Sequence, residues 1–336
     1  MQQLGFEGMP RRLYPCTPSR LRSWLDCPRR YRMTYLDRPS PPKGPPWAHN
    51  SLGASVHNAL AGWWRLKRAQ RTPEAAARLL ADGWINEGFS DDAQSAEYLR
   101  RSQTMVEEYV AKLDPACEPA GIERTVAAKT DLIAMSGRID RLDDRPANLS
   151  GVSAAIVSAA GISAAGTGAA GTGAPGSADE PDPFGRELVV VDYKTGRSRL
   201  STDDARSSLA LGLYALAAGR VLRRPCRAVE LHHLPSGQVL RWEHSPGSLE
   251  RHLRRAEDIA AECVAADQRY KSDPDAGRVD EVFPPAPGPA CGWCDFRSHC
   301  PEGIAATAPR RPWDGLDDNP MLSLNGPRGD AAAASD

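Results

Sequence analysis

The sequence predicts an α/β protein, with a mixed sheet as its core, a helical region before it and a cysteine-bearing segment after it. Three observations predict this fold class. Apolar residues recur at helical spacing through the first third, β-branched runs begin after Gly121, and three cysteines cluster after residue 290. Strands framed by helices are typical of an α/β core. The 336 residues, 41% hydrophobic and 25% charged, suit a soluble globular chain of one large domain or two ordinary ones.

The helical region is predicted to span residues 13–120. Thr17-Pro18-Ser19 is typical of a helix start, with Thr17 or Ser19 as the cap. A proline-rich loop, residues 39–46, follows the first helix. The apolar spacing predicts helices over residues 20–36, 51–69, 73–88 and 93–113.

The sheet core is predicted to span residues 121–270. Its apolar and β-branched runs predict strands over residues 122–128, 132–136, 138–142, 187–193, 228–234 and 238–244, with helices over 205–220 and 249–269. Residues 146–178, dominated by Ala, Gly and Ser, bury too little apolar surface to offset their ordering entropy. We expect them to form a flexible insertion within the core. Residues 271–303 form the expected cysteine segment, and residues 304–336 a disordered tail.

The strongest local signal is VVVDYKTG, which begins at Val189. Alternate residues of a strand share a face, so Asp192 and Lys194 are expected to point the same way at the end of a buried strand. Lysine among apolar strand residues needs a partner. The carboxylate can bind a divalent cation, and the ammonium can position an attacking water. Taken alone, the motif is more typical of a strand that ends in a surface ion pair, and the neighbouring motifs favour a metal site.

Two further side chains are candidates for the same metal site. Asp140, in SGRIDRLD, lies mid-strand, where its carboxylate needs either a neighbouring arginine or a metal. Paired with Asp192, it offers hard oxygen ligands that suit Mg²⁺ or Mn²⁺. His57, in LGASVHNAL, adds an imidazole that shifts the preference toward Mn²⁺, although a lone helical histidine is usually structural. Gly53, one turn earlier, permits a close approach.

The cysteines indicate a second site. Cys291, Cys294 and Cys300 have the spacing C-x2-C-x5-C, and Cys27, before a proline at a helix turn, is the natural fourth ligand. The spacing leaves a zinc site and a [4Fe–4S] cluster as alternatives. Either would join the two ends of the chain, so its binding energy would become folding energy. The other four cysteines are expected to be ordinary core or surface residues.

The charge and the termini indicate where the protein acts. A net charge of −1 does not by itself indicate a polyanionic partner, although arginines cluster between residues 11 and 38. No apolar run is long enough to span a membrane, and residues 1–12 lack the apolar segment of a signal peptide. We therefore expect a cytoplasmic protein that does not associate with membranes.

In this order, the motifs resemble the RecB-like branch of the PD-(D/E)XK nucleases, including the AddB nuclease domain and the CRISPR-adaptation exonucleases. The resemblance covers residues 13–303 without the insertion. It rests on SRLRSWLDCPRRYRMTYL from Ser19, LGASVHNAL from Leu52, SGRIDRLD from Ser136, VVVDYKTG from Val189 and CGWCDFRSHC from Cys291. It implies a restriction-endonuclease-like mixed sheet.

The resemblance also implies roles for individual residues. His57, Asp140 and Asp192 would bind the catalytic metal with the Tyr193 carbonyl, and Lys194 would be the catalytic lysine. Glu123 matches the first-strand acid, and Tyr214 matches the tyrosine of the helix after the lysine strand. Ala210 stands where the family commonly has glutamine. The family's [4Fe–4S] ligands correspond to Cys27, Cys291, Cys294 and Cys300.

The expected function is that of a metal-dependent deoxyribonuclease, an exonuclease of DNA repair or recombination acting on single-stranded DNA or duplex ends. No Walker A loop is present, so unwinding would require a helicase or repair partner. One alternative is a weak or inactive adaptor that binds DNA ends, as the missing glutamine would allow. Another is a zinc-stabilised protein with a different partner.

Overall fold

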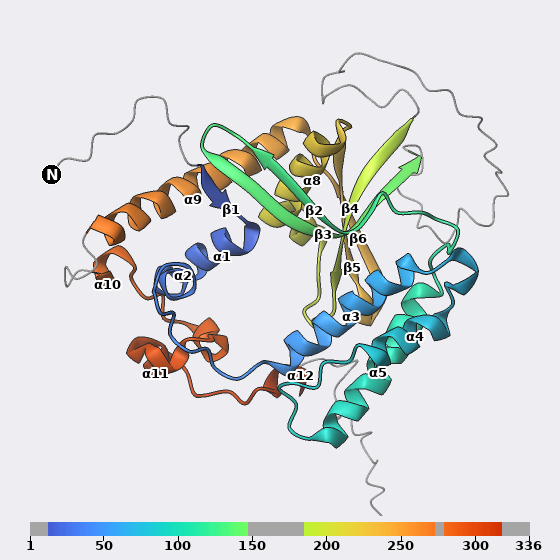
Figure 1. The fold of residues 1–336 in the computed structure, drawn as a ribbon, viewed down its shortest axis with the longest axis horizontal. Helices are drawn as coiled ribbons and strands as arrows, with labels where there is room; N and C mark the ends of the chain where they lie inside the picture. The colour runs from blue at the N-terminus through green and yellow to red at the C-terminus, as the bar shows by residue number, and fades with distance from the viewer. Residues whose placement is uncertain (1–12, 147–184, 273–278, 318–336) are drawn as a thin grey trace, which may run out of the picture.

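The computed structural model describes residues 13–146, 185–272 and 279–317, and it confirms the predicted α/β fold with a mixed sheet and N-terminal helices (Figure 1). The strands are β1 (Tyr14–Cys16), β2 (Gly121–Lys129), β3 (Ile133–Pro146), β4 (Arg186–Lys194), β5 (Cys226–His233) and β6 (Gln238–Glu243). The helices are α1 (Pro18–Asp26), α2 (Pro28–Tyr35), α3 (Ala48–Arg65), α4 (Pro73–Asp82), α5 (Asp92–Val110), α7 (Thr202–Ser207), α8 (Leu209–Leu222), α9 (Pro246–Ser272), α10 (Val279–Val282), α11 (Pro301–Ala306) and α12 (Asp314–Asp317). None of the described helices is long and apolar enough to cross a membrane.

The sheet has the strand order β1-β3-β4-β5-β6, and β2 also pairs with β3. β1 with β3 and β4 with β5 are parallel pairs, whereas β2–β3, β3–β4 and β5–β6 are antiparallel. The antiparallel β3–β4 ladder runs from Pro146–Arg186 to Arg141–Val191 and ends there. The next residues in that register are Asp140 and Asp192. The two predicted metal-binding carboxylates therefore lie where two central strands separate.

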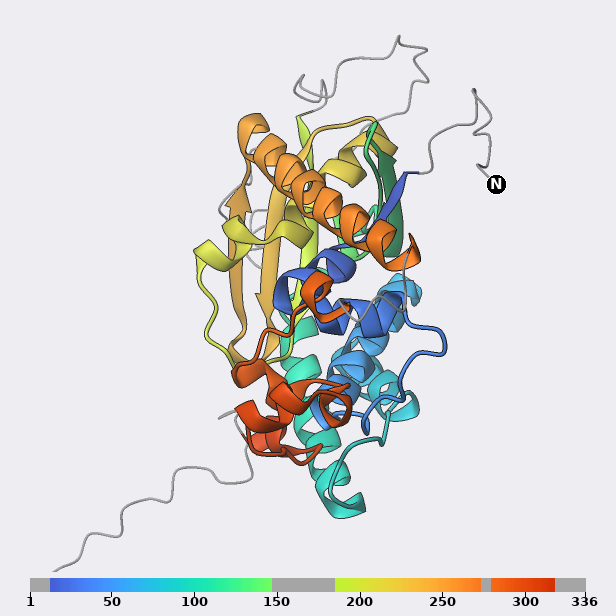
Figure 2. The same ribbon diagram turned by 90° about the vertical axis from the view of Figure 1, so that its left-hand side faces the viewer.

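Helices cover both faces of the sheet (Figures 1 and 2). On one face, Val189 and Val191 of β4 pack with α3, α4 and α5. On the other face, Leu188 and Val190 pack with α8. A third cluster joins α9 to α1, α2, β1 and the start of β3, and Tyr31 is fully buried there. β4 therefore has apolar side chains on both faces, which explains its unbroken valine run.

The first predicted helix, residues 20–36, is two helices. Cys27 ends α1 and begins α2 in an extended conformation, with φ −169° and ψ 112°. Pro28 disfavours the α conformation of the residue before it, so a single helix through this point was wrong. Thr17, one of the two predicted caps, accepts a hydrogen bond from the Arg20 N–H at 3.1 Å.

Other boundaries also differ from the predictions. The helix predicted over residues 205–220 is divided at Ser208, which caps α8. The two strands predicted over residues 132–142 are the single long strand β3. The three-residue strand β1 carried no sequence signal, because so short a run has no recognisable alternation.

The predicted tail is partly placed in the structure. α11 ends at Ala306, and α12 follows with Leu316 only 3% exposed. Leu316 and Trp313 pack against the core cluster that contains α3. Expecting disorder from residue 304 was therefore wrong up to residue 317, because two apolar side chains anchor the segment. Residues 147–178 of the predicted insertion and residues 318–336 lie outside the described residues.

Candidate metal centre and cysteine cavity

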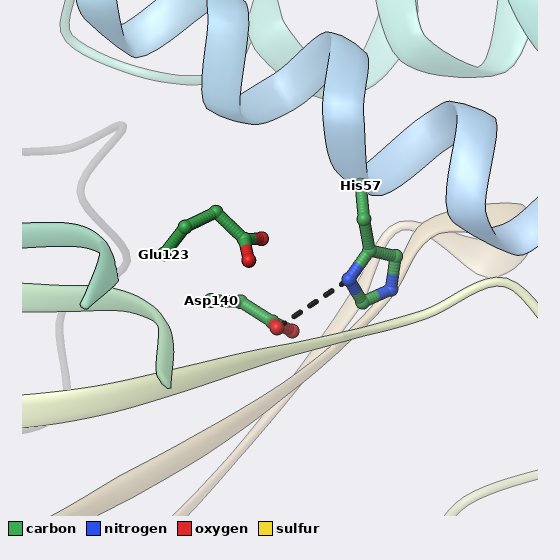
Figure 3. Close-up of side chains that lie close together, drawn as sticks. All are labelled: His57, Glu123 and Asp140. Atoms are coloured by element: carbon green, nitrogen blue, oxygen red, sulfur yellow. Dashed lines mark ion pairs between the residues drawn. The ribbon is translucent and has the colours of Figure 1, made fainter. Parts of the chain in front are cut away.

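Three predicted site residues meet at the point where β3 and β4 separate. His57 extends from α3, Glu123 from β2 and Asp140 from β3, and Figure 3 shows their side chains converging. One ligand atom from each residue lies within 4.8 Å of those of the other two. The imidazole Nδ1 of His57 is 3.4 Å from Oδ1 of Asp140. Two carboxylates and an imidazole form a donor set that suits a divalent cation of the Mg²⁺ or Mn²⁺ type.

Glu123 adopts an unusual backbone conformation. Its φ is +48°, in the left-handed region that non-glycine residues rarely occupy. The β2–β3 register pairs Ile122 with Arg141 and Arg124 with Ile139, so Glu123 lies opposite Asp140 at an interruption in the ladder. Such strain is tolerated mainly at functional sites. Arg138 holds the Glu123 carboxylate through an ion pair of 2.8 Å.

Asp192 and Lys194 lie at the end of β4 and form an ion pair, which confirms that they share a strand face. The Asp192 side chain is 19% exposed and that of Lys194 is 45% exposed. Oδ2 of Asp192 is buried and is the oxygen that Lys194 contacts. An ionised carboxylate has about four lone-pair sites, so Asp192 can accept a cation in addition to the lysine.

The centre concentrates negative charge. Burial raises the pKa of Asp192, and the charge of Asp140 raises it further against the opposing effect of Lys194. Burial and the charge of Asp140 also raise the pKa of Glu123. Burial alone would lower the pKa of His57, but its contact with Asp140 and the charges of Asp192 and Glu123 raise it. A bound cation would offset this repulsion, so the residues present fit a metal.

The grouping differs in one respect from the predicted ligand set. The sequence indicated His57, Asp140 and Asp192 as ligands with Glu123 in support, whereas the structure groups His57 with Glu123 and Asp140. Asp192 instead contacts Lys194. The backbone N–H of Tyr193 donates a hydrogen bond of 2.9 Å to Oδ2 of Asp140. That contact was not predicted, and the proposed ligand role of the Tyr193 carbonyl stays a prediction.

A buried polar network fixes Tyr193 on the face of the sheet that α3 and α5 cover. Its hydroxyl lies 3.3 Å from the Trp64 indole nitrogen and 3.2 Å from the Arg141 guanidinium. Arg141 also donates to the Tyr109 hydroxyl, which is 2.7 Å from Nδ1 of His232. Because the Tyr193 backbone holds Asp140, this network positions a carboxylate of the centre. No local pattern predicted this network, because its members are far apart in the chain.

Tyr214 of α8 lies beside the centre. Burial and the charges of Asp192 and Asp140 raise the pKa of its phenol to about 12. The ring packs against Gly137 of β3, where a Cβ atom would lie 2.3 Å from Cε1 of Tyr214. Gly137 is therefore required by this packing. Ala210, where the resemblance places glutamine, is half-buried one turn earlier on α8.

We predict that Gly137→Ala destabilises the protein by about 1–3 kcal/mol, because the added methyl overlaps the Tyr214 ring. Denaturant unfolding would measure the change. The cost should shrink in a Tyr214→Ala background, where the overlap is gone. Gly196→Ala is the matched control, since a Cβ there meets no atom within 4 Å. An equal loss from both alanine substitutions would contradict the packing argument.

The buried histidine that follows β6, His244, should make the free energy of unfolding depend on pH. His244 is 1% exposed, and burial lowers its pKa to about 4, aided by the charge of His252. The unfolded chain protonates this imidazole near pH 6.5, whereas the folded protein does so only near pH 4. The stability that the neutral, buried imidazole contributes is therefore complete above pH 6.5 and is lost as the pH falls toward 4. We expect His244→Gln to reduce the fall in unfolding free energy between pH 7 and pH 4 by about 2 kcal/mol. Equal falls in both proteins would rule out this role for His244.

The four predicted cluster cysteines line one cavity. Cys27 lies at the break between α1 and α2, Cys291 and Cys294 lie in and just after a 3₁₀ turn, and Cys300 caps α11. All four are free thiols. Among the described residues, no three of these sulfurs lie within 4.8 Å of one another. The segment around Cys27 and the segment from Cys291 to Cys300 therefore lie on the same cavity, but their thiols do not form a compact group.

Donors point at the sulfur of Cys300. The Arg29 guanidinium and the backbone N–H of Gly303 each lie 3.4 Å from it. The Arg29 side chain is only 6% exposed and also pairs with Glu302 and, at 3.0 Å, with Asp280. The Glu302 carboxylate also lies against this sulfur, with Oε2 at 3.6 Å. Arg29 was not predicted as a site residue, although its place two residues after Cys27 was a usable signal.

Comparison with known proteins identifies the family of the chain. Residues 15–153 and 178–301 match the family description "PD-(D/E)XK nuclease superfamily". The interruption in the match falls within the predicted insertion. A search of curated proteins finds no significant match.

Proposed function

Because the chain belongs to the PD-(D/E)XK nuclease superfamily, we propose that it is a RecB-like, metal-dependent deoxyribonuclease. The superfamily implies metal-dependent phosphodiester hydrolysis and a nucleic-acid substrate. The observation that carries the proposal is the convergence of His57, Glu123 and Asp140 beside the Asp192–Lys194 pair. Carboxylates, an imidazole and a lysine at one strand divergence are the groups that this chemistry needs.

Asp140, Asp192 and His57 would hold Mg²⁺ or Mn²⁺, with the Tyr193 carbonyl as a further ligand. Glu123 lies close enough to His57 and Asp140 to be a direct ligand as well. When bound, the cation supplies Lewis-acid stabilisation of charge that develops on the phosphate. Tyr193 keeps Asp140 oriented through its N–H, and Arg138 keeps Glu123 in place.

Lys194 would position the attacking water and offset charge on the phosphate. Its side chain is the most exposed of the group at 45%, so it can reach a bound strand, while Asp192 holds its position. A fixed ammonium beside a reacting phosphate stabilises the transition state without reorganisation. Tyr214 borders the same carboxylates and would shape the site from α8.

Cys27, Cys291, Cys294 and Cys300 would bind a [4Fe–4S] cluster that joins the ends of the chain. The support is their shared cavity and the donors directed at Cys300. A zinc ion held by the same four thiols is the alternative, and the choice of the cluster follows from the resemblance.

The biological role follows from the resemblance. We infer an exonuclease that acts on single-stranded DNA or duplex ends in DNA repair or recombination, in the cytoplasm, beside a helicase or repair partner. A second candidate is a weak or inactive module that binds DNA ends, and Ala210 in the place of glutamine favours it. The intact set of Asp140, Asp192 and Lys194 favours the enzyme.

Cleavage of labelled single- and double-stranded DNA by anaerobically purified protein tests the proposal. We expect cutting with Mn²⁺ or Mg²⁺, none with chelator, and none from the Asp192→Asn variant. DNA binding without cleavage in either metal would contradict the nuclease proposal and favour the module that binds DNA ends. Cutting that persists in Asp192→Asn would indicate a contaminating nuclease.

A further inference from the structure

Two exposed arginines lie beside the acidic residues of the metal centre. Arg138, two residues before Asp140 on β3, forms its 2.8 Å ion pair with Glu123 through Nε, and its side chain is 71% exposed. Arg65 is an exposed residue in the last turn of α3, the helix that also bears His57. The side chains of Glu123 and Asp140 are only 16% and 15% exposed. The carboxylates therefore lie deeper in the protein than the arginines beside them.

Both arginines retain hydrogen-bond donors that the protein does not use. Glu123 is the one ion-pair partner of Arg138 among the described residues, and a carboxylate engages about two of the five N–H groups of a guanidinium. Arg65 makes no hydrogen bond or ion pair within the part of the chain that the structure describes. Its charge nevertheless acts on Glu123. Burial and Asp140 raise the pKa of Glu123, whereas the charges of Arg138, His57 and Arg65 lower it.

The charges of the centre leave these arginines in excess once a divalent cation is bound. The carboxylates of the centre are those of Glu123, Asp140 and Asp192. Two charges from the cation and one from Lys194 balance these three. Arg65 and Arg138 then add uncompensated positive charge at the surface, which attracts a polyanion.

The cations border the carboxylates from opposite sides. Lys194 contacts Asp192 on β4, whereas Arg138 contacts Glu123 on β2, and β3 lies between these two strands. Arg138 and Lys194 each lie three residues beyond the last pair of the β3–β4 ladder, on strands that have separated. A single DNA strand laid across the separation would therefore meet the lysine at one phosphate and arginine at the next.

We propose that Arg65 and Arg138 together bind the phosphate next to the scissile one, on the Glu123 side of the centre. A guanidinium suits this ligand because its planar fork contacts two phosphate oxygens at once. Nε of Arg138 stays on Glu123, so the same side chain joins the substrate to a residue of the metal centre. The inference rests on the proposed nuclease function and names residues that position its substrate.

A purely structural role for Arg138 makes different predictions. Arg138 would then only hold Glu123 in its left-handed backbone conformation, and its loss would disturb metal binding together with DNA binding. The phosphate contact predicts a loss of DNA binding alone. It also predicts an equivalent loss at Arg65, which has no ion pair with Glu123 among the described residues.

Binding of a fluorescent single-stranded oligonucleotide, followed by anisotropy, tests the phosphate contact. The full-length Asp192→Asn protein is used with Ca²⁺, so that no cleavage occurs, and circular dichroism establishes that each variant is folded. Arg65→Ala and Arg138→Ala should each weaken binding about tenfold or more, and Arg138→Lys should restore part of the loss.

Arg68→Ala is the matched control. Arg68 lies three residues after Arg65 and is 63% exposed, but it pairs with Glu118, outside the centre. Its loss should change binding less than about twofold, because salt screens a distant exposed charge. Equal losses from Arg138→Ala and Arg68→Ala would mean general attraction to phosphates and would overturn the proposal.

Neutral phosphates locate the contact. Each oligonucleotide of a set carries a methylphosphonate in place of one phosphate, which removes one charge at a time. With both arginines present, one position should lower the affinity about tenfold. In the double variant Arg65→Ala/Arg138→Ala, the same position should have no effect, because its partners are gone. Identical profiles from the two proteins would refute the contact.

Mn²⁺ titration separates contact with DNA from support of Glu123. Arg138→Ala should leave the affinity for Mn²⁺ unchanged or raise it, because the variant removes a positive charge beside the carboxylates. Loss of Mn²⁺ binding together with DNA binding would mean that Arg138 acts through Glu123, and the phosphate contact would be wrong.

Cleavage and binding distinguish this inference from the nuclease function. Wild-type protein that cuts DNA, while both arginine variants bind DNA normally, would refute the phosphate contact and leave the nuclease function intact. Wild-type protein that does not cut DNA but shows the expected methylphosphonate profile would refute the nuclease function and support the contact.

Discussion

Replacing Lys194 with alanine is expected to lower DNA cleavage by about a thousandfold or more while the protein stays folded. The ammonium is 45% exposed, and its ion pair with Asp192 holds it at the site. Loss of a positioned group that stabilises a transition state costs about 10²–10³-fold, and loss of proton-transfer assistance adds to this. Single-turnover cleavage in Mn²⁺ would measure the loss.

Metal binding distinguishes Lys194 from the carboxylates. We expect Asp140→Asn to weaken Mn²⁺ binding at least about tenfold, because Asp140 contacts His57 and is fixed by Tyr193. Lys194→Ala should leave Mn²⁺ bound, since it removes a cation rather than a ligand. Isothermal titration calorimetry with Mn²⁺ would compare the two variants. Loss of Mn²⁺ binding in Lys194→Ala would mean that lysine organises the site instead of acting in the reaction.

The second large effect is expected from the cysteine cavity. Cys291→Ser should remove the visible absorption and bound iron of anaerobically purified protein and lower its Tm by about 10 °C or more. Cross-linking residues 27 and 291 closes a very long loop, for which the chain-entropy estimate is about 5 kcal/mol. Absorption spectra, iron analysis and thermal unfolding would test this.

Cys117→Ser is the matched control, since Cys117 is an exposed free thiol that does not line the cavity. It should retain both the iron and the Tm. Colourless wild-type protein with stoichiometric zinc would replace the cluster by a zinc site. Metal-free wild-type protein with unchanged stability in Cys291→Ser would remove the proposed structural role altogether.

The chemistry-bearing residues of the strands could be predicted because a strand imposes a strict period. Alternation alone placed Asp192 and Lys194 on one face, and their ion pair confirms it. The valine run before them predicted a buried strand, and the structure shows Val189 and Val190 packed on opposite faces of the sheet. Pro28 also predicts a helix break at Cys27, but the apolar spacing favoured one continuous helix there.

The long-range arrangement could not be predicted in this way. Glu123 enters the centre only because its strand has a residue at φ +48° opposite Asp140. The burial of Leu316 depends on α12 packing against α3, more than 250 residues away in the sequence. Such contacts depend on which distant segments meet, and a local pattern does not contain that information.

The sequence by itself determined the fold class, the strand that bears Asp192 and Lys194, and the cysteine types that could bind a metal. These follow from local periodicity and from the chemistry of single residues. Only the tertiary structure decided that Glu123 lies as close to His57 as Asp140 does, and that Arg29 and Gly303 direct donors at Cys300. The physical reason is that a site is a convergence of side chains, and convergence is set by how β3 and β4 separate and which helices pack over them.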